Sequence, residues 1–307
     1  MVVCLAHIHL PDGVMPLEWC AVWFVAAGLL VGLVMVVAVR RLGLKQRVVA
    51  AFLTVVLFVA MLIPVPSPFG GTHVNMTPFA GLVAGPATSA IIIFMVSLIL
   101  ALLGHGGVTV LGANMLVLYF ECVAAYLFYR ILRSRFNVYV SAFTATIAPL
   151  ILSTFLASGM LSVSVAGSPS YYLGEYMAEG VLVHGLFPEQ LAENPFIHEL
   201  VHGYLSGNPL FHEAIDKLAS SPLLPWIWLS SAPHLEEALF LMLRVVEASS
   251  PMRFFMVFTA ATLPVNTFVA VIEATVTGVV VQSTVKLRPD VVVAEQDARR
   301  AEDVVGN

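Results

Sequence analysis

Charged side chains are scarce in this 307-residue sequence, where Asp, Glu, Lys and Arg together make up 11%. An ordinary soluble domain carries roughly a quarter of its residues as charges, so the composition excludes that class. Hydrophobic residues amount to 59%, and the mean hydropathy is +0.93. We therefore expect an all-α integral membrane protein with the lipid bilayer as its solvent.

Other features are missing as well. The three cysteines, Cys4, Cys20 and Cys122, are odd in number and imply no disulfide framework. The sequence has no phosphate loop of the form G-x-x-x-x-G-K-[ST], so we do not expect this chain to hydrolyse ATP. Residues 1–6 are too short for a cleavable signal, and the first helix should direct insertion. We expect no catalytic residue, no cofactor and no nucleic-acid partner.

Long apolar runs are what the sequence has instead. Runs long enough to cross about 30 Å of hydrocarbon as helices occur at 19–39, 91–103 with its flanks, 111–132, 138–160 and 254–285. Shorter runs lie at 48–63 and 76–84. Glycine followed by proline, as at Gly85-Pro86, interrupts a helix. We therefore expect a short helix before this pair and a second helix that runs back in the opposite direction after it. The total is about seven transmembrane helices.

The few basic residues are unevenly placed. Eleven of the fourteen fall in three groups: Arg40, Arg41, Lys45 and Arg47; Arg130, Arg133 and Arg135; and Lys286, Arg288, Arg299 and Arg300. Basic loops face the cytoplasm in membrane proteins. We therefore expect a multi-pass protein of the cell membrane, with an extracytoplasmic amino terminus and a cytoplasmic carboxyl terminus.

The segment 167–250 differs from its surroundings, with five of the nine histidines and ten acidic residues against two basic ones. We expect an extracytoplasmic insert there. The predicted domains are a membrane domain at 1–166 with an amino-terminal metal-binding segment, the insert, a last transmembrane helix at 251–290 and a cytoplasmic tail at 291–307.

Histidines gather in segments that this topology places on the outer side. They are His7, His9, His73 and His105, in the stretches 7–13, 70–75 and 104–107; a fourth outer stretch, 112–114, holds Asn114. Imidazole nitrogen suits Ni²⁺, Co²⁺, Cu²⁺ and Zn²⁺, whereas Mg²⁺ and Ca²⁺ prefer oxygen. Their convergence predicts a transition-metal site. Asp12 either fixes an imidazole tautomer or serves the turn beside Gly13.

Several of these stretches match a known family in order along the chain. They are HLPDGV at 9–14, GTH at 71–73, LVAGP at 82–86, HGGVTVLGAN at 105–114, VIEATVT at 271–277 and RPD at 288–290. The sequence resembles the CbiM/NikM substrate-binding components of energy-coupling factor transporters for cobalt and nickel. The resemblance covers about residues 7–166 and 251–290.

The resemblance implies a metal held by the free amino terminus, a nearby backbone amide and two histidines. The implied ligands are His7 or His9 together with His73, with Asn75 as an alternative to His73. Asp12, Thr72, Asn75, His105 and Asn114 are the residues expected near the ion. In the family the chain starts just before its histidine, so we hypothesise that Leu5 is the initiator codon and Ala6 the mature first residue.

The resemblance also implies partners: a transmembrane coupling subunit, two cytoplasmic ATPase subunits and, in some systems, a small accessory membrane subunit. This chain would capture Ni²⁺ or Co²⁺ for an ATP-driven importer and would not itself be an enzyme. Glu273 lies within an apolar helix, where an ionisable group is costly. It either pairs with a polar neighbour such as Asn266 or couples ion binding to transport.

Two other functions stay open. His198, Glu199 and His202 fit the H-E-x-x-H pattern of zinc peptidases, although Pro195 and Gly203 leave little room for the long helix that carries it. A component that binds an organic vitamin would share the architecture, but it would line its pocket with aromatic side chains in place of imidazoles.

Overall fold

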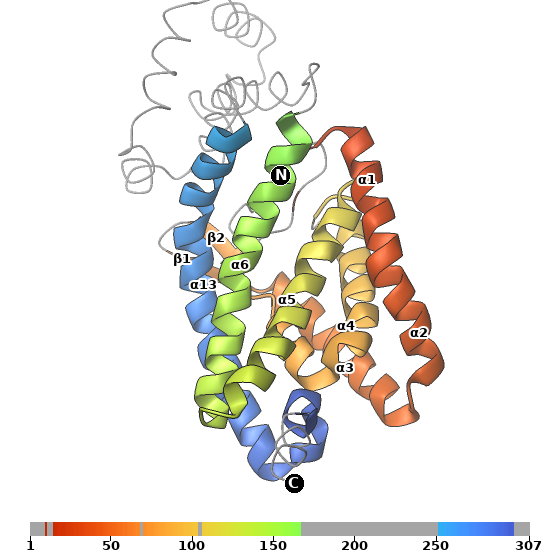
Figure 1. Cartoon of the computed structure of the whole chain (residues 1–307), viewed down its shortest axis with the longest axis vertical. Helices are drawn as coiled ribbons and strands as arrows, with labels where there is room; N and C mark the ends of the chain where they lie inside the picture. The colour runs from red at the N-terminus through yellow and green to blue at the C-terminus, as the bar shows by residue number, and fades with distance from the viewer. Residues whose placement is uncertain (1–9, 11–14, 68–69, 104–105, 167–250, 298–307) are drawn as a thin grey trace, which may run out of the picture.

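The computed structural model describes residues 10, 15–67, 70–103, 106–166 and 251–297 (Figure 1). The elements are α1 (Leu17–Ala27), the π-helical turn η1 (Gly28–Gly32), α2 (Leu33–Arg41), α3 (Leu44–Leu62), strands β1 (Pro64–Ser67) and β2 (Gly70–His73), α4 (Thr77–Leu102), α5 (Leu111–Arg133), α6 (Val138–Ala166), α13 (Pro251–Leu287) and the short helix η2 (Pro289–Val291). The predicted insert at 167–250 lies outside the described residues.

The described helices form one bundle (Figure 1). α13 packs along α6, α6 along α5, and α5 along α4, while α1 packs on α5 and α3 on α4. In the described part of the chain, six helices are long and apolar enough to cross a membrane: Leu17–Ala38, Leu44–Leu62, Thr77–Leu102, Leu111–Arg133, Val138–Ser164 and Phe258–Leu287. This confirms the all-α membrane class, because only helices and closed barrels satisfy the backbone within lipid.

The third of these helices, α4, is broken at Gly85, where the backbone is non-helical with φ 74° and ψ 166°. The hydroxyl of Ser89 donates to the carbonyl of Ala80 at 3.3 Å, although nine residues of straight helix rise about 13 Å. The chain therefore turns back at Gly85-Pro86, as the sequence predicts. The expected count of seven helices includes the short segment before Gly85, which is too short to cross a bilayer by itself.

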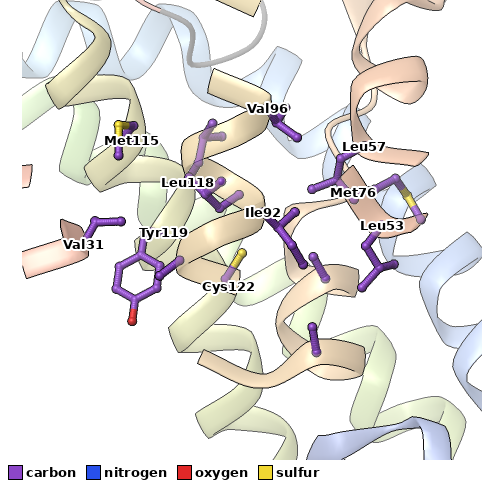
Figure 2. Close-up of a cluster of buried hydrophobic side chains, with 14 of the residues drawn as sticks. Val31, Leu53, Leu57, Met76, Ile92, Val96, Met115, Leu118, Tyr119 and Cys122 are labelled. Atoms are coloured by element: carbon purple, nitrogen blue, oxygen red, sulfur yellow. The ribbon is translucent and has the colours of Figure 1, made fainter. Parts of the chain in front are cut away.

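The core that positions the start of α4 lies between α3, α4 and α5. Met76 joins Leu53, Leu57 and Ile92 in one cluster of buried side chains (Figure 2). On the neighbouring face, a Cβ at Gly81 would collide with the backbone of Cys122 in α5. Small residues spaced four apart, such as Gly81 and Gly85, let helices approach closely. Gly81 does so here by letting α4 pack against α5 of the same chain.

The three basic groups meet at one end of the bundle. Lys45, in the first turn of α3, forms an ion pair with Asp290 at 2.6 Å, and Arg133, at the end of α5, forms one with Glu295 at 2.8 Å. Glu295 is fully buried and also accepts a hydrogen bond from the Tyr129 hydroxyl at 2.6 Å. The predicted tail is therefore docked on the bundle as far as residue 297, the last one described.

Candidate functional site

The candidate site begins at the hairpin of β1 and β2, where Pro64 lies opposite His73 and Val65 opposite Thr72 in antiparallel register. The hairpin follows α3 directly and places His73 two residues before Asn75. His73 is 3% exposed and Asn75 is fully buried. The outer loop predicted from the sequence therefore turns into the interior of the bundle before α4 begins.

The backbone that follows His73 is fixed by a buried carboxylate of α13. Glu273 is fully buried, and its Oε1 accepts a hydrogen bond from the backbone N–H of Asn75 at 2.7 Å. Its Oε2 accepts from the backbone N–H of Met76 at 3.2 Å. Met76 is the residue that caps α4, and its N–H is one of the donors that a helix start leaves without a backbone partner. A negative group there also complements the helix dipole.

The side chain of Asn75 is held by a second buried carboxylate, Glu121 of α5. Asn75 Nδ2 donates to Glu121 Oε2 at 3.0 Å, and the Thr77 hydroxyl makes a short hydrogen bond to the same oxygen. Asn75 Oδ1 accepts from the backbone N–H of Thr77 at 2.9 Å. The Ser153 hydroxyl of α6 donates to Glu121 Oε1 at 2.6 Å. We call Asn75, Thr77, Glu121, Ser153 and Glu273 the Asn75 cluster.

A separate contact fixes the amino-terminal segment at Leu10. Asn114, in the first turn of α5, accepts a hydrogen bond from the backbone N–H of Leu10 at 2.8 Å and donates from Nδ2 to the Leu10 carbonyl at 3.0 Å. The backbone N–H of Gly107 donates to the same carbonyl at 3.0 Å. The asparagine side chain thus pairs with both backbone groups of Leu10, as a neighbouring β-strand would. This fixes the position of Leu10, the residue after His9.

Four of the predicted site residues, His7, His9, Asp12 and His105, lie outside the described residues. His73, Thr72, Asn75, Asn114 and Glu273 are described, and the structure brings Asn75 and Glu273 into direct contact. Asn266, the partner considered for Glu273, donates instead to Thr154 Oγ1 at 3.0 Å. Within the described ranges, no group of three or more His, Cys, Asp or Glu residues is placed to hold a metal ion.

Sequence reasoning missed Glu121 and Ser153. Glu121 carries the same signal as Glu273, an ionisable residue inside an apolar helix. That signal was available from the sequence. Ser153 carries none, because a serine in a membrane helix commonly bonds to its own helix backbone. Only the packing of α6 against α5 identifies it.

The chain is similar to a known family of membrane proteins. A family model described as the CbiM cobalt uptake substrate-specific transmembrane region matches residues 9–189. That match covers more than half of the chain and includes His9, His73 and all of α4 and α5.

Individual relatives agree. A protein of Geobacter sulfurreducens named cobalt transport protein CbiM is 32% identical over 176 residues, which are 54% of this chain and 51% of that protein. The chain thus spans about half the length of that relative. A protein of Methanosarcina barkeri named putative cobalt transport protein CbiM 1 is 30% identical and is covered over 77% of its length, against 56% of this chain.

One solved structure, titled as a truncated transition metal transporter, aligns with a TM-score of 0.49 at 18% identity over 77% of this chain and 96% of that one. The extent of the family match and the Methanosarcina relative decide the assignment: this chain belongs to the CbiM family of cobalt uptake transmembrane proteins.

Proposed function

We propose that this chain is the substrate-capture membrane subunit of an energy-coupling factor transporter that imports Co²⁺ or Ni²⁺. The observation that carries the proposal is the burial of His73 at the end of β2, with the next residues tied to two buried carboxylates. A histidine held in this way presents a pre-oriented imidazole, which is a good ligand for both ions.

The remaining ligands come from the amino terminus in this proposal. Asn114 binds both the backbone N–H and the carbonyl of Leu10. We propose that His9, the residue before Leu10, and His7 supply these ligands. Asp12, Thr72 and His105 lie near the ion and orient its ligands. Co²⁺ is the ion to test first, because the relatives are named for cobalt transport. Ni²⁺ accepts the same nitrogen ligands.

Transport needs partners that supply energy. We propose a transmembrane coupling subunit, two cytoplasmic ATPase subunits and a small accessory membrane subunit. The end of the bundle with Lys45, Arg133 and the docked tail faces the cytoplasm, following the rule that basic loops stay inside. The amino terminus and the insert at 167–250 are then extracytoplasmic. The chain acts as a transport subunit and not as an enzyme.

The test is metal binding by the purified full-length chain. We expect one Co²⁺ or Ni²⁺ per chain by mass spectrometry of the metal content, and loss of that ion in His73→Ala. Intact mass of the same sample reports the mature first residue. Glu199→Ala is the matched control, because it removes the glutamate that a zinc peptidase would need. Zinc at His198 and His202, with no cobalt or nickel, would favour the peptidase.

A further inference from the structure

Glu121 is an unusual residue for its place in the bundle. It is fully buried in α5, and the described bonds engage both of its carboxylate oxygens. Oε2 receives the Asn75 amide and the Thr77 hydroxyl from the start of α4, and Oε1 receives the Ser153 hydroxyl from α6. One side chain therefore joins three helices at the point where the His73 hairpin enters α4.

Such a carboxylate is costly for the fold. An ionisable group inside a membrane helix costs several kcal/mol relative to an apolar one, and such groups occur mostly where they serve a function. Leucine at this position would avoid that cost, but it would leave the Asn75 amide and the Thr77 and Ser153 hydroxyls without this acceptor. The glutamate and its three donors therefore form one polar network across α4, α5 and α6.

The backbone beside Glu121 is also strained. Met76 has φ 56°, the left-handed conformation that disfavours residues with a Cβ, and it is the only such non-glycine residue in the described part of the chain. Its neighbours Asn75 and Thr77 are bound by Glu121, and its own N–H by Glu273. Its side chain is anchored in the core beside Leu53 (Figure 2). Strain persists where surrounding contacts over-determine it, and it marks functional segments.

We infer that Glu121 is a positioning residue for the metal site: by fixing Asn75 and Thr77 it sets the backbone turn at Met76 and thereby the direction from which His73 approaches the ion. The inference rests on the proposed role of His73 as a ligand. Glu121 does not touch the ion. It acts through Asn75, and Ser153 orients its carboxylate from α6.

The test is titration of the full-length chain with Co²⁺, following the visible absorption of the bound ion, which reports its coordination geometry. Glu121→Gln keeps the size of the side chain but has only one acceptor oxygen for the three donors. We expect Co²⁺ affinity to fall about 10- to 100-fold, the usual effect of losing a residue that orients a metal ligand. The absorption bands should shift, which a loss of stability alone would not produce.

Two serines of α6 provide a matched pair in case Glu121→Gln folds poorly. Ser153 and Ser158 are both fully buried, and each hydroxyl bonds to a carbonyl of its own helix, Leu150 at 2.9 Å and Thr154 at 2.6 Å. Ser153 also reaches Glu121, which is the difference that the pair tests. Ser153→Ala should weaken Co²⁺ binding and shift the bands in the same direction as Glu121→Gln. Ser158→Ala should leave both unchanged.

A double-mutant cycle tests whether Glu121 acts through Asn75. The effects of Glu121→Gln and Asn75→Ala on affinity should be clearly less than additive, because both remove the same contact. If His73→Ala binds Co²⁺ like the wild type, the proposed site itself fails, and this inference with it. If His73→Ala loses binding but Glu121→Gln and Ser153→Ala keep wild-type affinity and spectrum, only the positioning role of Glu121 is overturned.

Discussion

The carboxylate of Glu273, inside α13, accepts the backbone N–H of Asn75 at 2.7 Å across 198 positions of sequence. This bond ties the last helix of the bundle to the segment that carries His73. A movement of α13 would therefore displace the backbone at Asn75 and Met76, just before α4. Coupling of ion binding to transport is the second of the two roles that the sequence leaves open for Glu273, and a contact of this kind is what that role would need.

Glu273→Gln tests that role. The amide has one acceptor oxygen, so the N–H of Asn75 or of Met76 loses its partner at a cost of about 1–3 kcal/mol. We expect lower thermal stability, and a larger fall in cellular Co²⁺ uptake than in Co²⁺ affinity of the purified chain. Thr275→Ala, exposed on the same helix, is the control. Equal losses of uptake and affinity would argue for a purely structural contact.

Asn114→Ala removes both hydrogen bonds to the backbone of Leu10. Two buried backbone groups lose their Asn114 partner, and the segment with His9 loses its fixed point. We expect Co²⁺ affinity to fall at least tenfold by titration, on the scale of other residues that orient metal ligands. Asn137→Ala, which removes an exposed bond to the Val140 N–H, should leave affinity unchanged. Unchanged affinity in Asn114→Ala would mean that the amino-terminal segment does not contribute ligands.

Gly85→Ala tests the reversal in α4. The residue has φ 74°, and a Cβ there would lie 3.0 Å from Cγ1 of Val293. We expect a loss of about 1–3 kcal/mol from the backbone alone, because positive φ with extended ψ is a conformation essentially restricted to glycine. Adding Val293→Ala should relieve the steric part only. Gly28→Ala is the control, since its Cβ would meet nothing within 4 Å and its backbone is helical. Thermal unfolding of the purified chain measures the stability of each variant. Equal stability of Gly85→Ala and Gly28→Ala would contradict the turn at Gly85.

Two carboxylates of the docked tail, Glu295 and Asp290, form ion pairs of different burial. Glu295→Gln leaves the guanidinium of Arg133 without its buried carboxylate partner, at a cost of about 1–3 kcal/mol after allowance for the partly exposed arginine. Asp290→Asn removes the exposed pairs with Lys45 and Arg288 and should have little effect at neutral pH. Chemical unfolding of both variants tests this order, which comparable losses would contradict.

Acid should affect the exposed pair in a defined direction. Hydrogen bonds from Arg288 and Lys45 hold the pKa of the Asp290 carboxyl below its usual range. Because this pKa is depressed in the folded state, its contribution is present at neutral pH and is lost as the pH falls below the ordinary carboxyl range. The pH dependence of unfolding in wild type and Asp290→Asn should therefore differ only under acidic conditions.

The fold was largely predictable because lipid imposes strong rules on sequence. Apolar run lengths gave the six long helices to within a few residues at most ends, and Gly85-Pro86 gave the turn in α4. The three basic groups predicted one common end, which the Lys45–Asp290 and Arg133–Glu295 pairs confirm. The docking of the tail was not predictable, because polar residues such as Glu295 suggest solvent unless their partners are known.

The candidate site was predictable in part. His73, Asn75, Asn114 and Glu273 stand out as polar residues in apolar surroundings, and the family motifs contain His73, Asn114 and Glu273, with Asn75 two residues after the GTH motif. Of their partners, Glu121 stands out in the same way, as an ionisable residue within an apolar helix. Ser153 does not, and the contacts of Glu121 with Asn75 and with Ser153 arise only through the packing of α4, α5 and α6. The hydrogen bond from Asn75 to Glu121 joins residues 46 positions apart, and the local sequence around either residue does not reveal such a partner.

The most direct test of the account is Co²⁺ titration of the purified full-length chain, wild type against His73→Ala. The account predicts one tightly bound ion per chain in the wild type and at least a hundredfold weaker binding in the variant at equal thermal stability, because a ligand is lost and not only an orienting contact. Equal Co²⁺ affinity in the two proteins would contradict His73 as a ligand and remove the basis of the proposed capture site.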